Sequence, residues 1–72
     1  MNLDGFHADA IAVFQLNVAL FPTSANTYDS LGEGYMVHGD TALAIANYRR
    51  SLALEPGNDN ARRMLRRMGA RE

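Results

Sequence analysis

The chain has 72 residues, a net charge of -1 and no cysteine. This length allows one small domain with a modest core, too small to enclose a substrate, and the lack of cysteine excludes disulfides, thiolate metal sites and a cysteine nucleophile. No apolar run reaches the roughly 18 to 20 residues of a membrane span, and the first residues lack the basic and apolar segments of a signal peptide. We therefore expect a soluble chain without a membrane partner, cytoplasmic if it is free-standing.

Charge is distributed unevenly along the chain. Residues 1–48 contain five acidic and no basic residues, a net charge of -5, whereas residues 49–72 contain seven arginines and three acidic residues, a net charge of +4. A basic segment can attract nucleic acid, but it can also pair with acidic groups of the same or a neighbouring chain. We expect the second arrangement and no nucleic-acid partner.

Four helices and no strand are predicted, in chain order at residues 6–20, 25–38, 41–54 and 59–69. Apolar residues in the first and third segments recur at helical steps of three and four, as in Ile11, Phe14 and Val18. Each of these two helices ends before a proline, Pro22 or Pro56, because the residue before proline is pushed out of the helical region.

Cap and turn residues separate the helices. Ser24 and Asn58 lie where an N-cap side chain can accept hydrogen bonds from the first free amides of the next helix. Gly39, which is followed by Asp40, marks the turn between the second and third helices.

Three glycines, Gly32, Gly34 and Gly39, fall within residues 28–40 and could suggest a phosphate-binding loop. The dinucleotide fingerprint needs its third glycine three residues after the second, in a turn between a strand and a helix. Val37 occupies that place and no strand-like run precedes the segment. The glycines therefore need a helical explanation.

Gly32 is predicted to permit a close approach between its helix and the helix of residues 41–54. A glycine inside a helix costs about 1 kcal/mol relative to alanine, so it needs a compensating contact, and Ala42, Ala44 and Ala46 offer a small facing surface. Gly34 is predicted only to be tolerated on an exposed face or to loosen the helix locally.

An internal repeat underlies the helical pattern. Residues 5–22 align with residues 39–56 with eight of eighteen positions identical, among them the Ala10/Ala44 and Ile11/Ile45 pairs. A fixed period of about 34 residues is typical of stacked helical hairpins.

The residues at these spacings resemble the tetratricopeptide repeat (TPR) family. Its pattern is present as Tyr28, Leu31, Gly32, Tyr35, Ala44, Tyr48 and Pro56. The resemblance implies an all-α fold of antiparallel helix hairpins stacked as a short solenoid. It divides the chain into the second half of a repeat (5–22), a complete repeat (25–56) and a C-terminal capping helix (59–69).

The same resemblance implies a protein-protein interaction or scaffold module without catalysis. The first helix of each pair would line the concave, ligand-binding side, and the groove-facing candidates are Asn26, Asp29, Glu33, Val37, Asn60, Arg63 and Arg67. Family members that hold a chaperone's C-terminal carboxylate use a clamp of lysine and asparagine. This chain has no lysine, so that specific function is not expected.

Two ion pairs are predicted from the repeat, because Asp29 and Arg63 lie one full period apart, as do Glu33 and Arg67. Equivalent faces of stacked helices would place acid beside base. The alternative is that both arginines are free for an acidic partner.

The first helix is predicted to associate with another protein surface. It lacks the partner helix that would precede it, so one neighbour cannot cover all of its large apolar side chains, namely Phe6, Ile11, Val13, Phe14 and Leu16. We expect a homo-oligomer, isologous or not, or docking to a larger parent chain.

No catalytic, cofactor or metal site is predicted. His7 and His38 each lack a second ligand at helical spacing, and the serines, Ser51 included, fit helix caps or helix surfaces. A second resemblance, of residues 14–40 to the C-terminal repeat tails of some bacterial serine hydrolases, gives the alternative of an accessory segment whose active site lies outside this chain.

Overall fold

The computed structural model describes residues 3–70, and the side chains from residue 10 onward. It contains four helices, α1 (Leu3–Leu20), α2 (Ala25–His38), α3 (Thr41–Leu54) and α4 (Asp59–Arg67), and no strand within residues 3–70. The all-α prediction is confirmed. α1 begins three residues earlier than predicted, and α4 ends two residues earlier.

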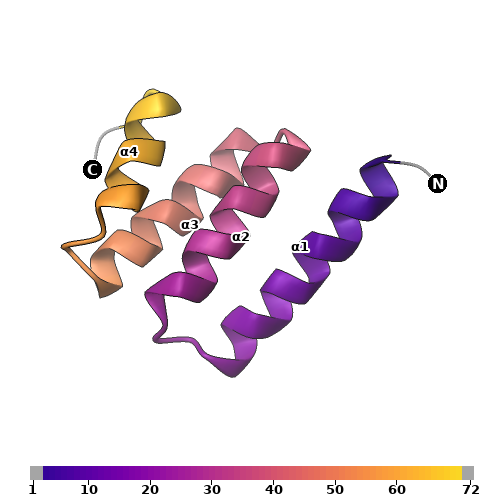
Figure 1. Cartoon of the computed structure of the whole chain (residues 1–72), viewed down its shortest axis with the longest axis horizontal. Coiled ribbons are helices and arrows are strands. Elements are labelled where there is room, and N and C mark those ends of the chain that lie inside the picture. Colours follow the sequence, from indigo (N-terminus) through magenta and orange to yellow (C-terminus); the bar gives the residue numbers. More distant parts are fainter. Residues whose placement is uncertain (1–2, 71–72) are drawn as a thin grey trace.

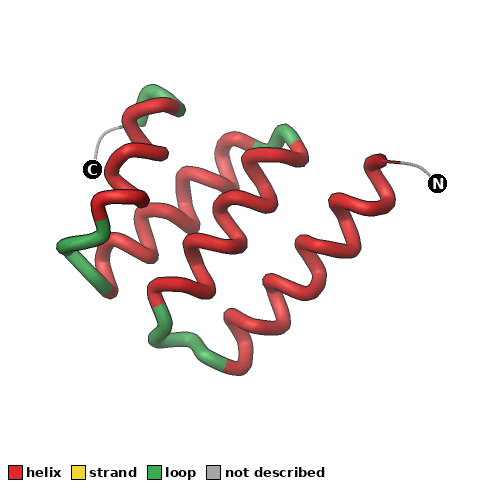
Figure 2. The backbone as a smooth tube through the Cα atoms, in the orientation of Figure 1, coloured by secondary structure: helices red, strands yellow, loops and turns green. Residues whose placement is uncertain are grey.

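The helices run up and down in chain order, each packed against the next (Figure 1). The connecting turns lie alternately at opposite ends of the helices (Figure 2), so α1 and α2, and then α2 and α3, form antiparallel hairpins of the TPR-like kind. α1 and α4 lie at the two opposite ends of the row, which measures 38 × 28 × 15 Å. One face of each terminal helix is therefore without a neighbour inside the described chain.

The helix starts use side-chain caps at two of the three described turns. The Leu43 amide donates to Asp40 Oδ1 at 3.2 Å, and the Ala61 amide donates to Asn58 Oδ1 at 3.2 Å. Ser24 holds the N-cap position of α2, but its side chain makes no capping hydrogen bond, so that prediction is wrong in mechanism. The Thr27 hydroxyl donates to the Ser24 carbonyl at 2.7 Å instead.

Gly32 does permit the close approach of α2 to α3, as predicted. A Cβ built there would lie 3.0 Å from two carbon atoms of the Tyr48 ring. The ring, rather than a row of alanines, is the facing surface, because Ala44 is buried but Ala42 and Ala46 are exposed. Tyr48 is itself 1% exposed, so Gly32 and Tyr48 together form the centre of the α2–α3 contact.

Gly34 has the same role on the opposite side of α2, so its prediction as an exposed or loosening residue is wrong. A Cβ at Gly34 would lie 3.1 Å from Phe14 Cδ2 and 3.4 Å from Ile11 Cγ1, both on α1. Residues two positions apart in a helix, such as Gly32 and Gly34, are separated by about 200° around its axis. The two glycines therefore face opposite neighbours, Gly32 toward α3 and Gly34 toward α1.

The main core lies between α3 and α4. Tyr48, Ala61 and Leu65 are fully or almost fully buried there, and Ile45, Leu52, Met64 and Met68 pack around them. Burying an apolar side chain of this size contributes about 1.5–3 kcal/mol, which explains how the short α4 is held in place.

Alanine substitutions at the two glycines should have different effects on the free energy of unfolding. Gly32→Ala gains about 1 kcal/mol of helix propensity, but overpacking against the enclosed Tyr48 ring costs about 1–3 kcal/mol. We expect a net loss of up to about 2 kcal/mol in the free energy of unfolding, measured by urea denaturation. Gly34→Ala meets Phe14, which is half-buried and can shift toward solvent, so we expect stability equal to or above that of the wild type.

Gly57→Ala is the control, because nothing lies within 4 Å of a Cβ at that position. Equal stabilities for the Gly32→Ala and Gly34→Ala proteins would contradict this account of the two contacts.

Candidate functional site

The α2 half of the predicted groove is mostly open to solvent. Asn26, Glu33 and Val37 are exposed, and Asp29 is half-buried. On α4, the equivalent positions Asn60, Arg63 and Arg67 are also exposed. We call these seven residues the α2–α4 face.

Asp29 is held by amides from the start of α4. Asn58 Nδ2 donates to Asp29 Oδ1 at 3.2 Å and to Oδ2 at 3.1 Å, and Asn60 Nδ2 lies 3.5 Å from Oδ2. These contacts fasten the N-terminus of α4 to α2, two helices that are separated in sequence by all of α3.

The same asparagine extends the network into the interior. Asn58 Nδ2 lies 2.8 Å from Ser51 Oγ, and the fully buried Ser51 hydroxyl donates to the Ala25 carbonyl at 2.9 Å. Ser51 is thus an interior residue and not a helix-surface one, which corrects the sequence interpretation. The Asn17/Ser51 equivalence in the repeat was the available signal, since it places a polar residue in each inward-facing stripe.

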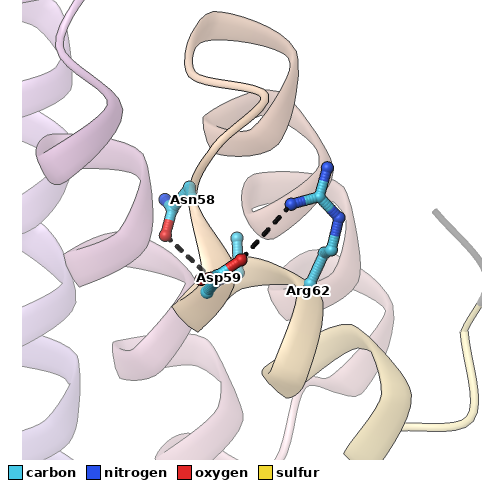
Figure 3. Close-up of polar contacts among 4 residues, drawn as sticks. Asn58, Asp59 and Arg62 are labelled. Atoms are coloured by element: carbon cyan, nitrogen blue, oxygen red, sulfur yellow. Dashed lines mark hydrogen bonds and ion pairs between the residues drawn. The ribbon is translucent and has the colours of Figure 1, made fainter.

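The two predicted ion pairs do not form. Within residues 3–70, no ion pair joins Asp29 to Arg63 or Glu33 to Arg67. At Asp29, neutral amides occupy the carboxylate instead. The ion pair that is formed on α4 is local, between Arg62 Nη1 and Asp59 Oδ1 at 3.5 Å, and Figure 3 shows it beside the Asn58 cap.

Tyr48 connects the core to this charged surface. Burial, together with the nearby negative charges of Glu33 and Asp29, raises the pKa of the Tyr48 hydroxyl to about 12. The carboxylates of α2 therefore act electrostatically on a tyrosine of α3 that contacts both α2 and α4. The α2 part of the face carries these two carboxylates, Asp29 and Glu33.

The predicted self-association residues divide into two groups. Ile11 is 8% exposed and Phe14 is half-buried against Gly34, so α2 covers both, contrary to the prediction that they are available to a partner. Val13 and Leu16 are 56% and 57% exposed. The side chain of Phe6 lies outside the described residues.

Leu20, which is 61% exposed, extends the open group. Val13, Leu16 and Leu20 follow steps of three and four and so form one stripe. We call this stripe the outer face of α1.

Among the described residues there is no group of three or more His, Asp or Glu side chains arranged to hold a metal ion. Within the same part of the chain, no helix combines the length and apolar character needed to cross a membrane.

The chain is similar to an Hsp70-Hsp90 organizing protein of Triticum aestivum, with 40% identity over 53 residues. The chain is built of TPR-like hairpins. The match covers 74% of this chain but only 9% of the wheat protein, and it supports TPR-like repeats. No family model and no solved structure matches the chain. The comparisons do not show similarity to bacterial serine hydrolases.

Asn58→Asp tests the amide network. The new side chain keeps an oxygen for the Ala61 amide but places a second carboxylate against Asp29. We expect the free energy of unfolding at neutral pH to fall by about 2–3 kcal/mol, since a hydrogen bond to a charged group is lost and repulsion is added. Asn60→Asp is the matched control, with an expected loss below about 1 kcal/mol because Asn60 is exposed. Equal losses in urea denaturation would contradict the network.

The raised pKa of Tyr48 predicts a pH dependence of stability. Because the folded-state pKa of about 12 exceeds the model value of 10.0, the contribution of Tyr48 is complete below pH 10 and is lost as the pH rises toward 12. We expect the melting temperature of the wild type to fall more steeply between pH 10 and 12 than that of Tyr48→Phe. Phenylalanine is the residue at the equivalent position 14, which makes it a suitable replacement. Parallel slopes would refute the assignment.

Proposed function

We propose that this chain is a protein-interaction module of the tetratricopeptide type, with no catalysis of its own, and that it binds a protein or peptide segment on the α2–α4 face. The observation that supports this most directly is that Glu33, Arg63 and Arg67 are exposed and form no ion pairs with one another. Val37 adds an apolar position to the same face. A surface of this composition can bind a segment through both charged and apolar contacts.

The charge of the face favours a ligand of mixed charge. Arg63 and Arg67 on α4 suit an acidic group, whereas Asp29 and Glu33 on α2 would repel one. The wheat relative is named for organizing Hsp70 and Hsp90, and we do not extend those partners to this chain, because it has no lysine for a carboxylate clamp.

We also propose that α1 provides a second contact, with another copy of the chain or with a larger parent. The exposed residues of its outer face, each more than half accessible, support this role. The alternative, an accessory segment of a bacterial serine hydrolase, has no structural observation in its favour.

Selection from a phage-displayed random peptide library tests the peptide-binding role. We expect enriched peptides to bind the double variant Val37→Ser/Arg67→Gln at least about tenfold more weakly than the wild type, a change of about 1.4 kcal/mol. The matched control Leu43→Ser/Arg49→Gln also changes one exposed aliphatic residue and one arginine, here on α3, and should retain binding. Failure to enrich any peptide, or equal loss in both variants, would contradict the proposal.

A further inference from the structure

The two ends of the helix row differ in chemistry. The outer face of α1 is apolar, and the opposite end is formed by α4 (Figure 1). Three exposed arginines of α4, namely Arg63, Arg66 and Arg67, form what we call the arginine face. Ala61 and Leu65 of the same helix are fully buried against α3, so Arg63, about half a turn away, and Arg66, about a third of a turn away, point away from α3.

The internal repeat shows that the apolar character of α1 is not a general property of such helices. Val13 and Leu16 correspond, one repeat further along the chain, to Asn47 and Arg50. On α3 these positions carry polar side chains, and Arg50 lies 5.8 Å from the centre of the Tyr28 ring. The positions on α1 have instead an apolar surface that no described residue covers.

The arginine face carries charge that forms no ion pair within the described part of the chain. Arginine side chains have long aliphatic stems that can lie along an apolar surface while the guanidinium group reaches beyond it. The face can therefore cover valine and leucine side chains and still bind carboxylates.

A symmetric contact at either end would bring like charges together. α1 contains Asp4 and Asp9, and residues 1–48 contain no basic residue to offset them. Two arginine faces would repel each other in the same way. Only a contact between unlike ends combines acidic with basic helices, because the two halves of the chain carry net charges of opposite sign.

We propose that copies of this chain associate head to tail, with the arginine face of one copy seated on the outer face of α1 of the next. This inference rests on the self-association proposed above and specifies its geometry. The contact is heterologous, so each added copy leaves one free end of each kind and the row does not close by itself. Since part of the attraction is between exposed charges, it weakens with salt.

Blocking one end at a time provides the test. Val13→Ser/Leu16→Ser removes the apolar surface of α1, and Arg63→Gln/Arg66→Gln removes two charges from α4. In 50 mM NaCl, sedimentation velocity should show the wild type growing beyond a dimer with concentration. Each variant alone should be monomeric, and an equimolar mixture of the two should give a dimer and nothing larger.

Circular dichroism should show that both variants retain the helical fold. The matched control Arg49→Gln/Arg50→Gln removes the same charge from α3 and should assemble like the wild type. For the wild type, we expect the dissociation constant to rise at least about tenfold between 50 and 500 mM NaCl.

Three results would overturn the head-to-tail arrangement. They differ in whether the proposals of self-association and of peptide binding remain. If the wild type stops at a dimer and the α4 variant also dimerises, the contact is symmetric through α1, and self-association stands. If the α4 variant and the α3 control are equally impaired, the effect is one of net charge and not of the arginine face. If the wild type is monomeric at 100 μM, the dissociation constant is weaker than about 10⁻⁴ M. The self-association proposal then fails too, while the peptide-binding proposal is unaffected.

Discussion

The fold depends on two glycines of α2, a helix that packs between two others, because each glycine lets an aromatic ring approach the helix backbone closely. Gly32 admits the Tyr48 ring on one side, and Gly34 admits the Phe14 ring on the other. The two rings occupy equivalent positions of the internal repeat. Each glycine costs about 1 kcal/mol of helix propensity, and at Gly32 the packing of the enclosed Tyr48 ring directly on the helix backbone offsets that cost.

A polar network fixes the position of α4 relative to α2 and α3. The chain of contacts from the Ala25 carbonyl through Ser51 and Asn58 to Asp29 joins α2, α3 and the start of α4. Apolar contacts alone would tolerate some sliding of α4 along α3, whereas a buried hydroxyl and a fixed carboxylate each require one position of Asn58. The network also explains why, within residues 3–70, Arg63 forms no ion pair with Asp29: neutral amides already donate to the Asp29 carboxylate.

The sequence predicted what depends on periodicity and local chemistry. The helices, the Gly32 contact and the caps at Asn58 follow from spacing and from the properties of single residues. The prediction for Gly34 was wrong because its neighbour, Phe14, is distant in the sequence and the repeat pattern assigns no residue to that contact. The prediction of an Asp29–Arg63 pair was wrong for a related reason. The repeat period relates the two positions, but it does not tell which of the nearby donors binds the carboxylate. The self-association residues could be assigned to α1 but not divided into inner and outer faces without knowing where α2 lies.

Arg66 shows how departures from the repeat define the ends of the row. It occupies the position in α4 that Gly32 occupies in α2. A helix packed on α4 as α3 packs on α2 would bring its aromatic ring to about 3.0 Å from the Cβ of that residue, where an arginine side chain leaves no space. Any helix that approaches α4 must therefore lie further out, over the arginine stems, and gains less from packing than α3 gains from α2. We propose that a contact of that kind is reversible and dependent on charge, whereas the contacts inside the row are closer. The repeat thus builds the scaffold, and the positions at which it is broken give each end the different chemistry on which the proposed contacts depend.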